Sequence, residues 1–227
     1  MFQPVQFGKY QLVQRIAVGG MAEIFKAKLS GVQGFEKLMV VKQILPQYSR
    51  NAEFIQMFID EAKIAVTLTH GNIVPVYELG RIKETYFIAM EYVPGKDLAE
   101  ILEQARNLGK PLSVEHAVYI AIELCKGLDY AHRRTNDDGR PLGVVHRDVS
   151  PPNVLVSMEG EIKITDFGIA KAAHKLGTTE AGVVKGTFGY MSPEQVRGLP
   201  VDHRTDIFST GILLHEMLTG RRLFTGA

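Results

Sequence analysis

The chain has 227 residues, of which 45% are hydrophobic and 22% charged, and its formal net charge is +1. This composition is typical of a globular protein with enough apolar residues for a substantial core. The near-zero charge argues against nucleic acid or an anionic membrane as a partner. No apolar run is long enough to cross a bilayer.

The single cysteine, Cys125, excludes an internal disulfide and favours a reducing compartment. We therefore predict a cytoplasmic protein. Cys125 lies in an apolar helical pattern, which predicts a buried, inert thiol in preference to a nucleophile.

The first ninety or so residues predict mainly β-strands, because runs rich in Val, Ile, Tyr and Phe alternate with glycine-containing turns. A Gly19–Gly20 turn separates the first two strands, and a second hairpin is expected to turn around Gly80. The expected strands are residues 10–16, 24–29, 37–45, 74–79 and 86–91.

One helix is expected among these strands, over residues 52–68, and its apolar stripe includes Glu61. A carboxylate on an apolar face is costly unless it is paired. Strand 37–45 supplies Lys42, which the strand period of two places on an inner face with Leu38. We therefore predict an ion pair between Lys42 and Glu61, and two unpaired surface side chains are the weaker alternative.

After residue 95 the pattern changes to helices. We expect helices over residues 97–108, 113–132 and 206–218. Ser113 is a plausible N-cap, and Gly220 is expected to end the last helix. Strands followed by helices indicate an α+β chain in two lobes, residues 1–93 and 94–227, joined by a hinge near residues 90–95.

A group of polar residues surrounds the next expected hairpin. Strands 154–156 and 162–164 flank a Glu159–Gly160 turn, so the residues before and after the hairpin should lie close together. Asp148 and Asn153 precede it, and Asp166 follows it. Two carboxylates and an amide at one place are typical of a site for divalent metal and phosphate. Taken singly, each would more often be a turn or capping residue.

The motifs occur in a distinctive order. A glycine-containing turn is followed by the strand lysine, the helix glutamate, His146-Arg147-Asp148 with Asn153, Asp166-Phe167-Gly168, and Ser192-Pro193-Glu194. This order resembles the protein-kinase superfamily, and the catalytic loop is most similar to that of bacterial eukaryotic-type (Hanks-type) serine/threonine kinases. The resemblance spans residues 8–226. It implies a bilobal kinase fold, with an antiparallel sheet and one helix in the N-lobe and a mainly helical C-lobe truncated after its third large helix.

The resemblance also implies a function. The chain would transfer the γ-phosphate of ATP to serine or threonine hydroxyls of proteins, with Asp148 as base. Asn153 and Asp166 would hold Mg²⁺ or Mn²⁺, while Lys42, steadied by Glu61, would bind the α- and β-phosphates. The remaining residues expected at the nucleotide, several of which would serve equally well as core, are Ile16, Gly19, Gly20, Ile24, Val40, Met90, Glu91, Val93, Asp97 and Leu155.

Residues 169–190 resemble an activation loop that carries Thr178, Thr179 and Thr187. A phosphate on this loop would be clamped by Arg147, and self-association for autophosphorylation is left open. By the same resemblance, Ala65, Leu79, His146 and Phe167 are expected to stack on a base formed by Asp206.

The chain departs from the family pattern in three places. Ala17 and Ala22 replace two glycines of the phosphate-binding turn, and Ser150 replaces a catalytic-loop lysine. The resemblance implies a longer C-lobe, so we expect Glu194 to be a buried carboxylate without its arginine. We also expect incomplete cover over the apolar face of the last helix, at Ile212, Leu213 and Met217.

These departures keep a second interpretation open, a pseudokinase that binds nucleotide or acts as a scaffold with little turnover. The intact set of Lys42, Glu61, Asp148, Asn153 and Asp166 argues against it. A kinase-like enzyme acting on small molecules is disfavoured, because such enzymes generally lack a segment ending in a Ser-Pro-Glu motif.

Overall fold

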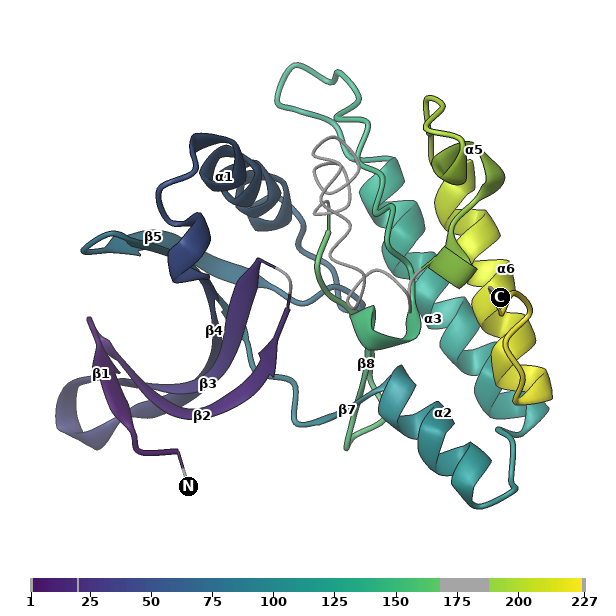
Figure 1. Cartoon of the computed structure of the whole chain (residues 1–227), viewed down its shortest axis with the longest axis horizontal. Coiled ribbons are helices and arrows are strands. Elements are labelled where there is room, and N and C mark those ends of the chain that lie inside the picture. Colours follow the sequence, from purple (N-terminus) through teal and green to yellow (C-terminus); the bar gives the residue numbers. More distant parts are fainter. Residues whose placement is uncertain (1, 20, 168–187, 226–227) are drawn as a thin grey trace. The chain divides into compact units, whose positions relative to one another are not determined.

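Figure 1 shows the computed structural model, in which residues 2–19, 21–167 and 188–225 are described. The chain divides into two compact units, Met1–Thr67 with Pro75–Tyr92, and Leu68–Val74 with Val93–Ala227. The segment Leu68–Val74 joins the second unit through its backbone. The N–H of Val74 donates to the carbonyl of Ile164 over 2.9 Å, and the N–H of Ile164 donates to that of Asn72 over 2.8 Å. The predicted division at residue 93 had placed Leu68–Val74 in the first lobe, whereas the structure groups this segment with the second unit.

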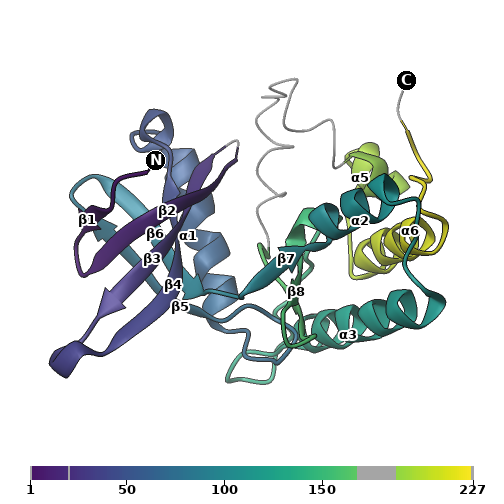
Figure 2. The same cartoon turned by 90° about the horizontal axis from the view of Figure 1, so that it is seen from below.

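The first unit is an antiparallel sheet with the strand order β1-β2-β3-β4-β6-β5 and one helix, α1 (Ala52–Val66) (Figure 2). The side chain of Asn51 caps α1 by accepting the N–H groups of Glu53 and Phe54. Aromatic and β-branched residues supply the strands. Their bounds are β1 Val5–Phe7, β2 Tyr10–Val18, β3 Ala22–Ser30, β4 Glu36–Ile44, β5 Val76–Ile82 and β6 Thr85–Glu91.

The turn predicted at Gly80 is wrong. Strand β5 passes through Gly80, and the chain reverses at Lys83, whose φ is 53°, and Glu84. A Cβ atom at Gly80 would lie 2.5 Å from the ring of Phe87 on the neighbouring strand. Glycine is therefore needed here for a close approach of two strands, and the sequence pattern does not distinguish this use from a turn.

Strand β4 turns its two faces to different surroundings. Met39 and Val41 are buried in the core of the first unit with Phe25 and Phe87. Leu38, predicted to face inward, is 42% exposed, so that assignment is wrong. The core of the first unit thus lies against the face of β4 that carries Met39 and Val41, and not against the face that carries Leu38 and Lys42.

The second unit combines helices with the three-stranded sheet β7-β8-β9. Its core includes Leu98, Leu124, Val154, Ile164 and Leu213. Strand β7 is too short for the sequence pattern to predict. The bounds are α2 Leu98–Asn107, α3 Val114–His132, α5 Pro193–Val196, α6 Arg204–Thr219, β7 Gly95–Asp97, β8 Val154–Ser157, β9 Ile162–Ile164, and the 3₁₀ turns Pro151–Asn153 and Phe188–Tyr190.

Two helix ends agree with the prediction. Ser113 caps α3 by accepting the N–H of His116, and Gly220 ends α6 with φ 68°. Two predictions about burial are wrong. The face of α6 that was expected to lack cover is buried, and Cys125 is exposed on α3 because the core-facing stripe passes through Leu124 instead. Among the described residues, no helix combines the length and hydropathy that crossing a membrane would require.

Candidate active site

The loop that carries Asp148 is anchored on a buried carboxylate of α6. The N–H groups of His146 and Arg147 donate to the two carboxylate oxygens of Asp206, each over 2.8 Å. Arg147 has φ 68°, a left-handed conformation that is unfavourable for a residue with a side chain. The bonds to Asp206 offset this strain and hold the loop in one conformation.

The imidazole of His146 ties the loop to the end of the β8–β9 hairpin. Its Nε2 lies 2.9 Å from the carbonyl oxygen of Thr165, while its Nδ1 accepts the N–H of Asp148 over 3.2 Å. These two bonds together require the neutral tautomer with the proton on Nε2. The ring also packs edge-on against Phe167, with centroids 4.6 Å apart. The expected stacking on Asp206 is thus confirmed for these two members.

The convergence predicted for Asp148, Asn153 and Asp166 is confirmed. The Nδ2 atom of Asn153 donates to Oδ2 of Asp148 over 2.9 Å and to its backbone oxygen over 2.8 Å. The carbonyl oxygen of Asn153 accepts the N–H of Thr165, which brings Asp166 alongside. Asp166 also has a positive φ, 62°. Two such residues in one small region mark a place where function outweighs backbone strain.

The pKa of Asp148 is raised above its ordinary value, first by burial and also by the neighbouring charge of Asp166. The hydrogen bond from Asn153 acts in the opposite direction. A positive charge on His146 would lower the pKa too, but its hydrogen bonds indicate a neutral ring. A buried carboxylate beside a second carboxylate forms a natural place for a cation.

Ser150 points into the loop. It is buried, and its hydroxyl donates over 3.4 Å to the backbone oxygen of Asp148. At this distance the bond is weak. The hydroxyl is therefore directed at the loop that carries Asp148.

The ion pair predicted between Lys42 and Glu61 is confirmed in the first unit. Nζ of Lys42 lies 2.9 Å from Oε1 of Glu61, and both side chains are almost fully buried. Two charges this far from water are retained at a considerable desolvation cost. A lysine held in one position is suited to binding a phosphate.

An apolar surface adjoins Lys42 on the same face of the sheet. Ile24 lies directly opposite Lys42, and Val40 lies opposite Met90. Directly paired residues of antiparallel strands share a face. Ile24 and Val40 are half-buried, and Ile16 at the end of β2 is 49% exposed.

The β2–β3 turn is closed by the N–H of Gly19, which donates to the oxygen of Ala22 over 2.8 Å. Gly20, which was expected to bind phosphate beside Gly19, lies outside the described residues. The N–H of Glu91 donates to the carbonyl oxygen of Pro75. Val93 is half-buried.

Asp97 and Leu155 pair directly across β7 and β8 in the second unit. Asp97 also caps α2, accepting the N–H of Glu100 over 2.8 Å, and burial raises its pKa. One of its carboxylate oxygens therefore already has a structural role.

The sequence-family model of the protein kinase domain matches residues 10–227 of this chain. The chain belongs to the protein kinase family.

Among curated proteins, it is 46% identical to the tyrosine-protein kinase MasK of Myxococcus xanthus over 99% of the chain, and 36% identical to the serine/threonine-protein kinase PrkC of Bacillus subtilis over 96%. It covers 34% and 32% of these relatives, so it spans about a third of their length.

The fold agrees with this membership. The PknI kinase domain of Mycobacterium tuberculosis superposes with a TM-score of 0.73 at 27% identity, over 97% of this chain and 78% of that one. The predicted protein-kinase-like fold is confirmed.

Glu194 was predicted to be a buried carboxylate without its arginine, and the predicted burial is wrong. Glu194 is half-buried, and Oγ1 of Thr205 donates to it over 2.8 Å. Hydrogen bonds from its own backbone N–H, Thr205 and Ser192 lower its pKa, so it remains ionised. The activation-loop threonines Thr178, Thr179 and Thr187 lie outside the described residues.

The kinase domain uses two residues that sequence analysis missed. His132 Nε2 lies 2.7 Å from Asp206, and Nε2 of Gln195 donates to the carbonyl of Arg147 over 2.7 Å. Both reinforce the loop that carries Asp148. The signal for His132 was its place at the last residue of α3, four residues after the buried Leu128. Gln195 gave no signal that distinguishes it from a surface glutamine.

Proposed function

We propose that this kinase domain transfers the γ-phosphate of ATP to serine and threonine hydroxyls of proteins. Asp148 accepts the proton of the attacking hydroxyl, and Lys42, fixed by Glu61, binds the α- and β-phosphates. Asn153 and Asp166 hold the magnesium. The cytoplasmic location suggested by composition stays a prediction.

The observation that carries this proposal is the arrangement around Asp148. Its carboxylate is oriented by Asn153 and its backbone by His146, whose own backbone is fixed on Asp206. A base that is held in this way transfers a proton without first reorganising. A loop with only a structural role would not need strained backbone at both Arg147 and Asp166.

The residues present fit a magnesium ion with ATP. The side-chain nitrogen of Asn153, Nδ2, donates its hydrogen bonds to Asp148. The side-chain oxygen of Asn153, Oδ1, is therefore the atom that would bind a metal. Carboxylate and amide oxygens are the ligands that magnesium prefers. When bound, the ion would neutralise charge on the phosphates. Ile24, Val40 and Leu155 would supply apolar contacts for the adenine, and Met90 would limit the depth of its site. The other residues proposed around the nucleotide are Ile16, Gly19, Gly20, Glu91, Val93 and Asp97.

The choice of acceptor has two candidates. PrkC of Bacillus subtilis and PknD of Mycobacterium tuberculosis, 38% identical to this chain, are named serine/threonine kinases, which supports serine and threonine. MasK, at 46% identity, is named a tyrosine kinase.

Asp148→Asn tests the proposal. With radiolabelled ATP, magnesium and a mixed protein substrate, we expect the variant to lose at least about a thousandfold in rate, since it loses the base but keeps the shape. Phosphoamino-acid analysis of the wild-type product identifies the acceptor. Phosphoserine and phosphothreonine support the proposal, whereas phosphotyrosine alone would replace it with the tyrosine alternative.

Nucleotide binding provides the control, because Asp148→Asn should leave affinity for magnesium-ATP within a few-fold of wild type. If wild type binds magnesium-ATP but transfers no phosphate, also when the domain is part of the longer polypeptide, the pseudokinase interpretation is favoured instead.

A further inference from the structure

Two histidines meet where α3 ends and α6 begins. His132 is the last residue of α3, and His203 directly precedes the first residue of α6. The centroids of their imidazole rings lie 5.6 Å apart, and the ring planes are inclined by 55°. His203 is exposed, and the side chain of His132 is 13% exposed. We call these two residues the histidine pair, which is accessible from solvent on the side of His203.

A buried carboxylate fixes the ring of His132. Its Nε2 lies 2.7 Å from Oδ2 of Asp206, whose side chain is fully buried. In the neutral ring Nε2 then carries the proton, and Nδ1 carries a lone pair. Within residues 2–19, 21–167 and 188–225, this Nδ1 has no hydrogen-bond partner. Metal-binding histidines usually donate their other ring N–H to a carboxylate, which orients the ring and raises its basicity. His132 already has this arrangement.

The spacing of the two rings suits a single transition-metal ion. Such an ion binds imidazole nitrogen at about 2.0–2.1 Å, which places the centres of two bound rings roughly 5–6 Å apart. The observed distance is 5.6 Å, and the exposed side chain of His203 is free to turn one nitrogen toward the ion. No third histidine, cysteine or carboxylate joins the pair in the part of the chain that the structure describes, so water would complete the coordination.

The charges around the histidine pair favour a cation. The carboxylate of Asp206 lies directly behind the first ring. Two guanidinium groups belong to neighbouring residues, but each is neutralised by its own carboxylate. Nε of Arg133 donates to Asp129 over 3.0 Å, and Nε of Arg204 donates to Asp202 over 3.0 Å. These ion pairs leave no uncompensated positive charge to repel a metal ion.

We propose that the histidine pair binds one divalent transition-metal ion, such as Zn²⁺, through Nδ1 of His132 and one ring nitrogen of His203. The ion would connect the end of α3 to the start of α6 and stabilise the folded state. Because Asp206 also holds the backbone of His146 and Arg147, the ion would reinforce the support of the loop that carries Asp148. The binding itself does not depend on phosphate transfer.

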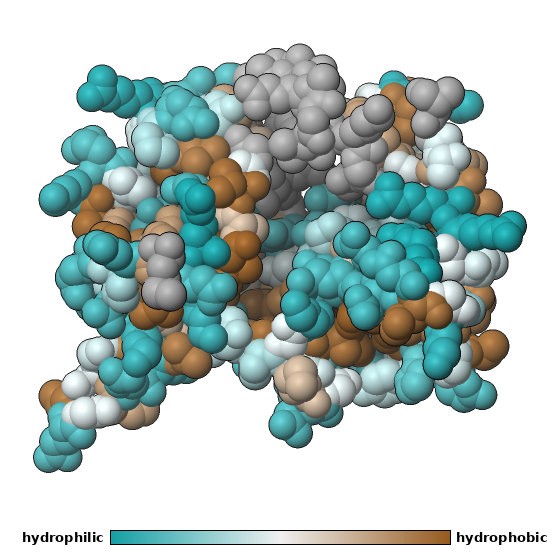
Figure 3. All heavy atoms as spheres, turned by 60° about the horizontal axis from the view of Figure 1, so that its bottom comes forward, coloured by the Kyte–Doolittle hydropathy of each residue, from teal (hydrophilic) through white to brown (hydrophobic). Residues whose placement is uncertain are grey.

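Imidazole nitrogen determines which ions this site takes. Zn²⁺, Ni²⁺ and Cu²⁺ bind well to imidazole, whereas Mg²⁺ and Ca²⁺ prefer oxygen ligands. Figure 3 shows hydrophilic side chains over much of one face of the molecule, and the carboxylates among them are ligands of the second kind. Excess magnesium would therefore occupy carboxylate sites, including the one proposed at Asp148 and Asp166, and leave the histidine pair to the transition metal.

Calorimetric titration of the whole chain with Zn²⁺, in a buffer that does not chelate metal and with excess Mg²⁺, tests the proposal. We expect one high-affinity ion per chain. His203→Ala removes one ligand from an exposed position and should weaken binding by about tenfold or more. His132→Gln should weaken binding to a similar extent, because its amide can still donate to Asp206 but has no ring nitrogen for the metal.

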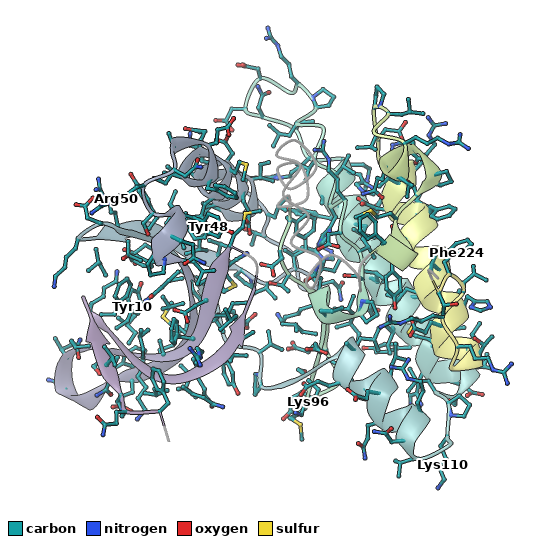
Figure 4. The ribbon with its side chains drawn as sticks, viewed as in Figure 1. Tyr10, Tyr48, Arg50, Lys96, Lys110 and Phe224 are labelled. Carbon is teal, nitrogen blue, oxygen red and sulfur yellow. The ribbon has the colours of Figure 1, made fainter. Side chains whose placement is uncertain are left out.

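His116→Ala is the matched control. His116 is exposed in the first turn of α3, where its Nδ1 lies 3.1 Å from the hydroxyl of Ser113. This is the end of α3 that follows Lys110, away from His132 (Figure 4). The control should keep the zinc affinity of wild type. Thermal unfolding checks that each variant is folded, and Zn²⁺ should raise the Tm of wild type and of the control by about 2 °C or more, but not that of His203→Ala.

Electron paramagnetic resonance of the Cu²⁺-loaded chain counts the nitrogen ligands directly, and we expect two. The proposal is overturned if His203→Ala binds Zn²⁺ as tightly as wild type, or if His116→Ala loses as much affinity as His203→Ala. A copper spectrum with a single nitrogen ligand would also overturn it, because the two rings would then not share one ion.

Discussion

At the residue scale, the candidate active site is organised by bonds to backbone groups. Asp206 accepts two N–H groups, His146 accepts one and contacts a carbonyl, and Asn153 donates to the backbone and carboxylate of Asp148. The side chains named by the kinase pattern therefore fix the path of the chain, in addition to the chemistry proposed for them. Substituting any of them should change geometry and reactivity together.

Asp148 gives a pH-dependent prediction for stability. Its pKa is raised by burial, so the folded state keeps its proton to higher pH than the unfolded chain. The free energy of unfolding should therefore fall as pH rises from about 4 through the folded pKa. Asp148→Asn removes this loss, and we expect it to be more stable than wild type at neutral pH, by about 1–4 °C in Tm.

Thermal unfolding from pH 4 to 8, without metal or nucleotide, measures this difference. The gap in Tm between variant and wild type should widen as pH rises. A gap that stays constant across this range would show that Asp148 titrates as an ordinary exposed carboxyl.

At the element scale, sequence patterns located the longer helices and strands but not β1, β7 and α5, and they misassigned what some residues do. Gly80 lies inside β5 because the ring of Phe87 covers it, and Leu38 is exposed because the core of the sheet is on the other face of β4. Both errors have one cause. The alternation of apolar and polar residues and the glycine content are properties of the local sequence. The burial of a side chain depends on residues that are far away in the sequence.

Gly80→Ala tests the close approach of β5 and β6. The added methyl must displace the Phe87 ring, so we expect a loss of about 1–3 kcal/mol in the free energy of unfolding. Chemical denaturation measures it. Gly71→Ala is the matched control, since nothing lies within 4 Å of a Cβ there and its φ is not positive. The control should change stability by less than about 1 kcal/mol. Equal effects of the two substitutions would contradict the contact.

At the scale of the whole molecule, the residues proposed to bind magnesium-ATP belong to two compact units with separate cores. Lys42 and Glu61 form an ion pair within the first unit. Asp148 and Asn153 are hydrogen-bonded to each other within the second. Each half of the candidate site is therefore built by the local fold of its own unit.

Hydrogen exchange tests whether one ligand engages both halves. We expect saturating magnesium-ATP to slow exchange in β4 and in β9, since a ligand at about 100 times its Kd stabilises the folded state by about 2.7 kcal/mol. Asp166→Asn should reduce the effect in both units, because it removes a proposed metal ligand. Protection confined to one unit in the wild type would contradict the proposed nucleotide contacts.

The sequence by itself determined the α+β organisation, the kinase family pattern, the Lys42–Glu61 pair and the convergence of Asp148, Asn153 and Asp166. These follow from periodicity and from motifs that lie close together in the chain. Only the tertiary structure decided that Asp206 accepts the N–H groups of His146 and Arg147, that His132 contacts Asp206, that Glu194 accepts a hydrogen bond from Thr205, and that α3 keeps an apolar face exposed. Each of these depends on contacts or cover that arise only when the elements pack, which spacing along the chain does not record.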